Sequence, residues 1–541
     1  MYNNRSANFK YFLFTLLFVG IPLSFGFYRL YKNQNNLVNY FDIAMKQRDR
    51  DIAVATKRIQ DPKALPSELK STAWLDVQNK VKDTVIQVFA HVARFNWEEP
   101  YKTPDQLEGC GSGFFINDQG YFITNYHVIN QASSVQIQIP AFGRQRFDVD
   151  IIGACPDRDI ALLKLKDDAA QEIRLKLGKI NYLDCFGDSD SIVRTQEVLA
   201  LGYPLGQERL KSTLGIVSGR ERAGFIQITA PINPGNSGGP CLNSSGEIIG
   251  INFAIVPDAQ NVGYIIPINE VKTAIKDLYS VKLLRKPVLG CIFTVTTPDF
   301  VKYLGNPVGG GWYIARVFPD TILDEIGIQE NDMLYKINGY DIDYYGELSV
   351  PWSEDKISLL DFLNRFTVDD DISFVVYRSG VRKDFNFKLS NKYMPPIRKV
   401  HPEFEPDFTD YEVIGGMVVM PLSLNHVATL IERVTELSRY IRPETQHESA
   451  VLITNVLPDS QAQKARVLTK GAVIDQVNGK EIKTMADFRE AVKKSKEIGY
   501  LTVKTNDKMF AALPVDKILE DEDRLSRRYF YNKSNLLDEL A

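Results

Sequence analysis

The pattern of apolar and polar residues divides the chain into an uncharged N-terminal stretch, a polar stretch, a series of short strands and a repeated C-terminal part. No charged residue lies between Lys10 and Arg29, and an apolar stretch of this length can cross a bilayer. No small-residue cleavage site follows it, so we expect residues 1–35 to form an uncleaved membrane anchor rather than a signal peptide or a soluble core helix. The polar residues 36–70 predict a helical linker or stalk, because their apolar positions fall near one helix face.

Beyond residue 71, short apolar segments alternate with turn residues. The sequence Asn117-Asp118-Gln119-Gly120 between two of these segments is typical of a hairpin turn. Many short strands separated by turn signals predict an all-β sandwich or barrel, which a helix at 271–279 would close. The expected strands are 85–89, 113–116, 121–124, 135–139, 149–152, 160–166, 197–201, 212–218, 225–229, 248–254 and 262–266.

An internal repeat organises the C-terminal part of the chain. Residues 313–320 match residues 452–459, and residues 335–339 match residues 475–479. Two related modules are therefore expected after the β-rich domain. The Pro-rich stretch 393–406 predicts the boundary between them.

Composition and charge exclude several classes of protein. At 541 residues, the chain is too long for a single core and should hold about three domains. Its net charge of −4, with no long basic run, gives no indication of nucleic-acid binding. The five cysteines are odd in number, widely spaced and without a Cys-x-x-Cys pair, so we expect neither a zinc site nor a disulfide framework. No cluster of ligand residues in the sequence indicates a metal or an organic cofactor.

The stretch Gly235-Asn236-Ser237-Gly238-Gly239-Pro240 carries the strongest chemical signal. Glycine tolerates backbone angles that are closed to other residues, and it lets another backbone or a ligand approach closely. A tight turn here would place backbone N–H groups beside the Ser237 hydroxyl, as an oxyanion-binding site requires. An ordinary Asn-Gly surface turn is the alternative interpretation of these residues.

A serine nucleophile needs a base and a third group that orients the base. Only five histidines occur in the chain, and His127 lies at the end of a predicted strand beside the polar residue Asn125. Asp159 directly precedes the apolar strand 160–166, where a carboxylate is costly unless it is paired. Each residue also has a structural interpretation, His127 as a packed polar residue and Asp159 as a strand-entry turn. Together they give the order His, Asp, Ser within one β-rich domain.

Three motifs taken together resemble the HtrA/Deg family of serine proteases: Thr124-Asn125-Tyr126-His127-Val128, Asp159-Ile160-Ala161-Leu162-Leu163-Lys164 and the stretch 235–240. The resemblance covers about residues 71–515. It implies a mainly-β architecture, in which a chymotrypsin-like double β-barrel is followed by two PDZ-like α/β domains. The expected boundaries are 1–35 for the anchor, 36–70 for the linker, 71–282 for the protease domain, 283–400 for the first PDZ-like domain, and 401–541 for the second with its C-terminal tail.

The resemblance implies a role for each residue of the site. His127 is the general base, Asp159 is its orienting partner and Ser237 is the nucleophile. The oxyanion hole is formed by Gly235, Asn236 and Ser237, with N–H groups from Gly235 and Ser237 and with Asn236 shaping the turn. Two further segments match glycine-containing motifs of the family, namely Gly111-Ser112-Gly113 and Leu201-Gly202-Tyr203-Pro204.

The side-chain preference at the cleavage site is predicted in part. Pro231 stands where basic-specific members of the wider superfamily carry an aspartate, so no carboxylate is expected to receive Arg or Lys. Ile251, Asn252 and Phe253 resemble the pocket wall of the family. An apolar wall favours small or medium aliphatic side chains, and we hypothesise a broad preference for Val, Ile, Ala or Leu.

The two repeated modules resemble PDZ domains, which bind peptide C-termini by adding a strand to a sheet edge. The carboxylate-binding loop of the first would be Val288-Leu289-Gly290-Cys291, and Ile414-Gly415-Gly416-Met417 is a weaker candidate in the second. Both modules depart from the usual pattern, through an insertion at 340–356 and an added helical segment at 423–440. Peptide binding is therefore a stronger expectation for the first module than for the second. The residues after Asp516 are expected to form a loosely packed tail.

We expect a membrane-anchored, ATP-independent serine endopeptidase that cleaves misfolded or unfolded proteins in protein quality control. The resemblance implies homotrimers or larger homo-oligomers. It also implies a resting state in which loops misalign the oxyanion hole, and 205–211 and 219–224 would be the loops that change conformation on activation. The loop 94–108 is of modest length, so we expect no large regulatory insertion there. The alternatives are a PDZ-based binding or chaperone protein with little proteolytic activity, and an esterase. The first is disfavoured because all three triad residues are present. A single anchor fits a protease domain in the periplasm, with an organellar membrane as the alternative.

Overall fold

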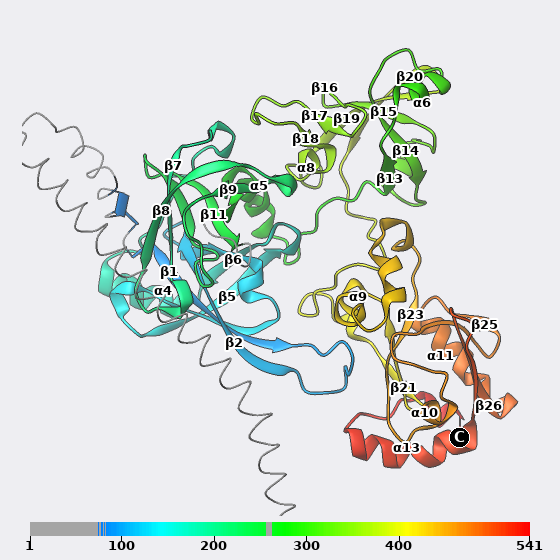
Figure 1. Cartoon of the computed structure of the whole chain (residues 1–541). Coiled ribbons are helices and arrows are strands. Elements are labelled where there is room, and N and C mark those ends of the chain that lie inside the picture. The colour runs from blue at the N-terminus through cyan, green and yellow to red at the C-terminus, as the bar shows by residue number, and fades with distance from the viewer. Residues whose placement is uncertain (1–73, 75–76, 79, 82, 256–261, 541) are drawn as a thin grey trace, which may run out of the picture. The chain divides into compact units, whose positions relative to one another are not determined.

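The computed structural model describes residues 83–255 and 262–540, together with Trp74, Val77, Gln78, Lys80 and Val81. Residues 76–541 form one compact unit, whose elements are labelled in Figure 1. The predicted anchor and linker, residues 1–70, lie outside the described residues. Among the helices that the structure describes, none has both the length and the apolar character that crossing a membrane requires.

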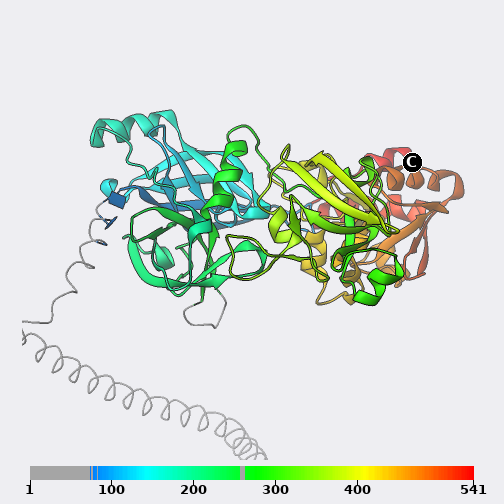
Figure 2. The ribbon, with the colours of Figure 1, turned by 90° about the horizontal axis from the view of Figure 1, so that it is seen from above.

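The first six strands close into a barrel in the order β1-β2-β3-β6-β5-β4. Residues such as Ile86 and Val88 of β1 fill its interior, because alternate side chains of a strand point to the same face. Helix α4 (Asp167–Leu177) lies on the outer side of this barrel and buries Ala170 and Ile173 (Figure 2). The strands are β1 (Val85–Arg94), β2 (Asp105–Phe115), β3 (Tyr121–Thr124), β4 (Ala132–Gln138), β5 (Arg146–Cys155) and β6 (Ile160–Leu165).

The second barrel is also closed, in the order β10-β11-β12-β9-β8-β7, and α5 (Ile268–Leu278) follows it. The predicted β-barrel fold with a closing helix is therefore confirmed, and each expected strand has a counterpart. Strand β10 has no counterpart among the expected strands, because Pro240 begins it and proline is rare inside sheets. The strands are β7 (Glu197–Gly202), β8 (Lys211–Arg220), β9 (Ile226–Ile228), β10 (Pro240–Asn243), β11 (Ile248–Ile255) and β12 (Gly263–Pro267).

The hairpin between β1 and β2 extends beyond the first barrel, and its tip packs on the C-terminal module. Trp97 is buried, with its ring edge-on to that of His426 at 5.0 Å between centroids. Tyr101 packs against Tyr531 in the same way, at 5.9 Å. The modest length of loop 94–108 does not predict such a reach, which arises because β1 and β2 stay paired as far as Arg94.

The first repeated module is a sheet in the order β13-β14-β15-β19-β20, with β16 paired to β15. Strand β17 lies within the insertion expected at 340–356, and it pairs with β18, which directly follows the insertion. The strands are β13 (Cys291–Thr294), β14 (Trp312–Val317), β15 (Met333–Ile337), β16 (Tyr340–Asp341), β17 (Glu347–Leu348), β18 (Ile357–Ser358), β19 (Asp371–Arg378) and β20 (Val381–Lys388). The helices are α6 (Pro298–Tyr303), α7 (Ile322–Glu325) and α8 (Leu359–Leu363).

The second module repeats this sheet, in the order β21-β22-β23-β24-β26-β27, with β25 paired to β24. The matching sequence segments form β14 and β23 and then β15 and β24, so the repeat in sequence is a repeat of strands. The strands are β21 (Glu412–Ile414), β22 (Met417–Pro421), β23 (Val451–Val456), β24 (Val473–Val477), β25 (Lys480–Glu481), β26 (Tyr500–Thr505) and β27 (Phe510–Pro514). The helices are α9 (Leu424–Leu430), α10 (Gln461–Ala465), α11 (Met485–Lys493), α12 (Ser495–Ile498), α13 (Val515–Tyr529) and α14 (Leu536–Leu540).

The two modules differ at one sheet edge. In the first, β13 pairs only with β14 within the part of the chain that the structure describes. In the second, β22 pairs with β23 on one side and with β21 on the other. Gly415 and Gly416 form the hairpin turn between β21 and β22, with φ of 58° and 87°. The weaker candidate loop 414–417 is therefore the turn of a hairpin, and this hairpin occupies the edge that a peptide would use.

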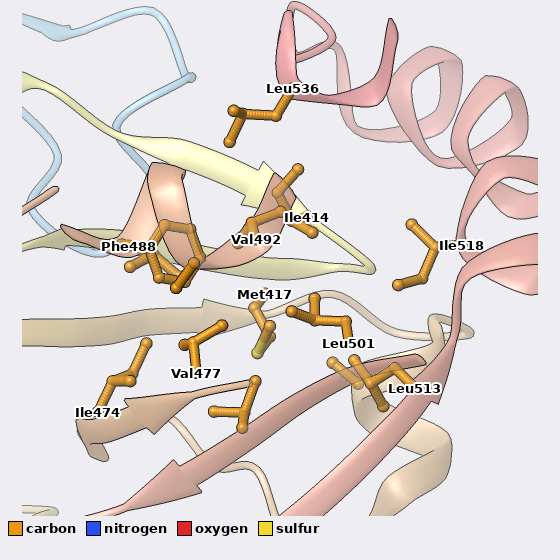
Figure 3. Packing of buried hydrophobic residues seen from close by; sticks show 14 of the residues in the cluster. Ile414, Met417, Ile474, Val477, Phe488, Val492, Leu501, Leu513, Ile518 and Leu536 are labelled. Atoms are coloured by element: carbon orange, nitrogen blue, oxygen red, sulfur yellow. The ribbon is translucent and has the colours of Figure 1, made fainter. Parts of the chain in front are cut away.

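The C-terminal residues are packed, which corrects the expectation of a loose tail after Asp516. Helix α13 buries Ile518 and Leu525. Ile518 joins Phe488, Val492 and the leucines of α14 in one apolar core, part of which Figure 3 shows. Ile518 and Leu525 lie two helical turns apart on one face, but the charged residues between them obscure this spacing in the sequence.

Candidate active site

Asn125 alone separates the end of strand β3 from α3 (Tyr126–Ile129), the short helix that carries His127. The Asp159 carboxylate accepts two hydrogen bonds from His127, one from the backbone N–H and one from Nδ1, both at 2.7 Å. The side chain of His127 is 44% exposed and that of Asp159 is 14% exposed. The carboxylate therefore favours the tautomer with its proton on Nδ1, which leaves Nε2 available to accept a proton.

The position of Asp159 is fixed by the turn before it and by hydrogen bonds to its carbonyl oxygen. It follows the 3-10 turn Pro156–Arg158 and has a left-handed φ of 54°. Its carbonyl oxygen accepts hydrogen bonds from the Tyr126 N–H at 3.2 Å and from the Asn125 side-chain amide at 2.9 Å. The two residues that precede His127 therefore hold the start of α3 against Asp159.

Glycines shape the turn that carries Ser237. Gly235 and Gly238 have φ of 100° and 88°, which side chains rarely tolerate. A Cβ on Gly235 would lie 2.3 Å from the Tyr203 carbonyl oxygen, and one on Gly238 would lie 2.1 Å from the Ser112 carbonyl oxygen. The stretch is therefore a tightly packed turn and not an ordinary surface loop.

Two backbone N–H groups of this turn are unused. Within the described part of the chain, neither the Gly235 nor the Ser237 N–H donates a hydrogen bond, whereas the Asn236 N–H bonds within the turn. The Pro234 carbonyl accepts a hydrogen bond from the Leu205 N–H at 2.6 Å. Because a trans peptide directs its C=O and N–H to opposite sides, the Gly235 N–H points away from Leu205. The turn thus offers two donors to an oxyanion, and Asn236 serves the shape of the turn.

The Ser237 hydroxyl donates to the Phe253 carbonyl oxygen at 3.0 Å. The Phe253 ring in turn lies edge-on to the His127 imidazole, with 6.2 Å between the centroids. The Ser237 hydroxyl and the His127 ring therefore flank the same residue, and a proton transfer between them would require the hydroxyl to leave this carbonyl for Nε2. Such catalytic hydrogen bonds are often long or absent before a substrate binds.

The four predicted pocket residues occupy different places. Ile251 and Asn252 are buried in β11, where the Asn252 N–H donates to the Gly239 carbonyl at 2.8 Å. Asn252 therefore supports the nucleophile turn from within the barrel. Phe253 is half-buried at the site, and Pro231 is exposed.

Phe225 belongs to the site although no motif in the sequence marks it. Its ring stacks on that of Phe253, with 4.7 Å between centroids and an angle of 16° between planes. It directly follows the loop 219–224, which the family resemblance predicts to switch. In the sequence, only the position of Phe225 directly after this loop could have indicated that it belongs to the site.

Two known domains match this chain, a trypsin-like peptidase domain at residues 111–251 and a PDZ domain at residues 400–534. A probable periplasmic serine endoprotease, DegP-like, from Marinomonas sp. (strain MWYL1) is 28% identical over 398 residues, which cover 72% of this chain and 75% of the relative. The periplasmic pH-dependent serine endoprotease DegQ from Escherichia coli (strain K12) is 35% identical over 261 residues, which cover 45% of this chain and 54% of the relative. The chain is thus similar to serine endoproteases named DegP-like, DegQ and HtrA.

The chain is a serine-type endopeptidase with a PDZ domain. The matched peptidase segment contains His127, Asp159 and Ser237. Among solved structures, the HtrA-type protease AlgW with a decapeptide is similar over 60% of this chain and 99% of its own, at 22% identity and a TM-score of 0.46.

Residues 288–291 lead into β13, the edge strand of the first module. Leu289 is buried in the core, and Gly290 has a φ of 76°. The Gly290 carbonyl accepts a hydrogen bond from the Phe318 N–H at 2.9 Å, and a Cβ on Gly290 would overlap the Thr321 side chain. A tight glycine loop therefore precedes the open sheet edge, an arrangement that suits strand addition by a peptide.

Two buried histidines lie where the protease domain meets the C-terminal module. Burial lowers the pKa of His401 to about 4 and that of His426 to about 3. The His401 ring is hydrogen-bonded through Nδ1 to the Tyr126 hydroxyl at 2.7 Å, next to His127 in the chain. Both rings are therefore neutral in the folded protein at neutral pH.

Acidification from about pH 6.5 to about pH 4 is expected to destabilise the folded chain. The unfolded chain binds protons at these histidines near their ordinary pKa, whereas the folded chain does so only at lower pH, so protons favour unfolding in this window. The measurement is Tm against pH for the wild type, His401→Asn and the half-buried control His91→Asn. The decline should be shallower in His401→Asn alone, and equal slopes in all three would contradict this origin.

Proposed function

We propose that this chain is an ATP-independent serine endopeptidase that cleaves misfolded or unfolded proteins with Ser237, His127 and Asp159. The observation that carries the proposal is the pair of hydrogen bonds from His127 to the Asp159 carboxylate. The unused N–H groups of Gly235 and Ser237 support it, because they supply an oxyanion site beside the hydroxyl.

The proposed mechanism is acyl transfer in two steps. His127 Nε2 takes the Ser237 hydroxyl proton as Oγ attacks the scissile carbonyl carbon, and Asp159 stabilises the resulting imidazolium through Nδ1. The carbonyl oxygen becomes an oxyanion that accepts hydrogen bonds from the Gly235 and Ser237 N–H groups. The imidazolium then gives its proton to the leaving amine, and a water molecule activated by the same imidazole hydrolyses the acyl-enzyme.

In this proposal, the first PDZ-like module binds peptide C-termini and the second is structural. The open edge of β13 and the tight loop at Gly290 support peptide binding by the first module. In the second, β21 already pairs with the corresponding strand β22, which leaves no edge there for a peptide.

Anchoring, location and assembly belong to the same proposal. The uncharged stretch between Lys10 and Arg29 supports a single N-terminal membrane anchor. Relatives named as periplasmic endoproteases support a periplasmic protease domain. Assembly into homotrimers or larger homo-oligomers rests on the family alone, and the boundaries at 282 and 400 remain predictions.

Degradation of unfolded casein by the purified full chain tests the proposal. The wild type is expected to degrade casein without ATP, and Ser237→Ala is expected to lose this activity, because a triad without its nucleophile retains little catalysis. Ser244→Ala is the matched control, since Ser244 is an exposed serine in the turn after β10. Labelling with a fluorophosphonate reports an activated serine independently of the protein substrate.

Each outcome has a distinct meaning. Equal degradation by the wild type and Ser237→Ala would mean that another site is active. Neither degradation nor labelling of the wild type would favour a PDZ-based binding or chaperone protein. Labelling of Ser237 without degradation of casein would retain the nucleophile and reject unfolded proteins as its substrates.

A further inference from the structure

Ser112 takes part in four hydrogen bonds, two of which join the first barrel to the nucleophile turn. It lies on β2 and is fully buried. Its hydroxyl donates to the Gly235 carbonyl at 2.6 Å and accepts from the Tyr203 N–H at 2.9 Å. Its backbone N–H donates to the Ser237 carbonyl at 2.8 Å, and its carbonyl accepts from the Thr124 hydroxyl at 2.7 Å. One residue of the first barrel therefore holds the carbonyls of both Gly235 and Ser237.

These two carbonyls constrain where the N–H groups of the turn point. A peptide unit is planar, so holding its carbonyl orients the whole unit. The Ser237 N–H belongs to the unit 236–237, which lies between the two units that Ser112 holds. The Gly235 N–H belongs to the preceding unit, whose carbonyl the Leu205 N–H holds. Ser112 therefore constrains the Ser237 N–H from both sides and the Gly235 N–H from one side.

Two glycines let the backbone pack closely around Ser112. A Cβ on Gly113 would lie 2.8 Å from the Ile123 carbonyl oxygen, and one on Gly202 would lie 2.9 Å from the Ser112 hydroxyl oxygen. The Gly-Ser-Gly and Leu-Gly-Tyr-Pro motifs thus meet at this hydroxyl. An alanine at 112 would remove the partner of two buried backbone groups, and unpaired buried groups are costly.

We propose that Ser112 is a positioning residue of the oxyanion hole, which holds the Gly235 and Ser237 N–H groups in the direction that the transition state needs. It touches neither the substrate nor the reacting atoms. Its effect is preorganisation, because donors already aimed at the developing oxyanion need no reorganisation during the reaction. The proposal rests on the proposed function, since it takes Ser237 as the nucleophile. The competing interpretation is a purely structural link between the two barrels.

Steady-state kinetics of Ser112→Ala separate the two interpretations. We expect kcat for a peptide substrate to fall about 10- to 100-fold with KM nearly unchanged, somewhat less than for the loss of an oxyanion-hole donor itself. Ser189→Ala is the matched control and should keep the wild-type kcat. Ser189 is also fully buried and accepts from a backbone N–H, that of Asn269, but it has no hydrogen bond to the nucleophile turn among the described contacts.

A peptide boronic acid gives a second readout. Its adduct with Ser237 is tetrahedral and mimics the transition state, so its inhibition constant depends on the oxyanion hole. We expect Ser112→Ala to raise this inhibition constant by about the same factor by which it lowers kcat. The Kd of a non-reactive peptide of the same sequence should stay unchanged, whereas a structural defect would weaken both.

An unchanged kcat in a folded Ser112→Ala chain would overturn the proposal, and so would equal weakening of the boronic acid and the non-reactive peptide. Where Ser112→Ala does not fold, Ser112→Cys replaces it, because a thiol keeps the shape but bonds weakly. An intermediate kcat is expected for Ser112→Cys, and a wild-type kcat would overturn the proposal. A wild-type chain without proteolysis or fluorophosphonate labelling would refute the proposed function instead.

Discussion

Replacement of Asp159 by asparagine is expected to lower kcat about 10⁴-fold while the chain stays folded. The Asp159 carboxylate accepts from two donors of His127, the backbone N–H and Nδ1. An amide offers one acceptor oxygen and one donor nitrogen in the same space. The imidazole is then favoured in the tautomer with its proton on Nε2, and it can no longer take the proton of Ser237.

The measurement is kcat for a peptide substrate, with Asp157→Asn as the matched control. Asp157 lies two residues earlier and pairs with Arg285 instead of His127. Its variant should keep a near wild-type kcat. A loss of less than about tenfold in Asp159→Asn would remove Asp159 from the triad, and equal losses in both variants would indicate a local folding defect.

Replacement of Ile518 by alanine is expected to destabilise the second PDZ-like module by about 3 kcal/mol, in the usual range for truncating a large aliphatic side chain in a core. Ile518 is fully buried on α13 and belongs to the cluster that contains Phe488 and Val492. The loss combines the removed apolar burial with the cavity left behind, which the surrounding strands and helices fill only in part.

Hydrogen exchange in peptides from α11 and β27 measures this loss, because it reports the stability of one region in a chain of several domains. Exchange there should become roughly a hundredfold faster in Ile518→Ala. Phe530→Ala is the matched control, since Phe530 directly follows α13 but is 86% exposed, and its effect should stay below about 0.5 kcal/mol. Indistinguishable exchange in the two variants would mean that the C-terminal helices are as loose as the sequence alone predicts.

The barrel strands other than β10 and the site motifs could be predicted because each has a signal within a few residues. Alternating apolar residues predict the barrel strands, and the glycines around Ser237 indicate a special turn. The pairing of His127 with Asp159 is different, because the two residues are far apart in the sequence and only the family resemblance joins them. The structure brings them to hydrogen-bonding distance.

The features that the sequence did not predict depend on distant partners. Gly415-Gly416 suits a carboxylate loop as well as a hairpin turn, and the outcome depends on whether Glu412–Ile414 finds a strand to pair with. Ser112 belongs to a recognisable motif, but its partners lie on the other barrel. The Ser237 hydroxyl has no local signal for its bond to the Phe253 carbonyl, which requires β11 to lie behind the turn.

A duplicated binding module ordinarily doubles the number of binding sites in a chain. Here β21 pairs with β22 and so covers the sheet edge of the second module that corresponds to the open edge of β13 in the first. Under the proposed function, each chain would contribute a single site for strand addition, so the stoichiometry of peptide binding in an assembly would equal the number of chains. The covered edge is also closed to strands of other molecules, and open edges invite such unwanted pairing. Under the same proposal, the second copy would serve as a scaffold whose sheet edge is filled by its own strand β21.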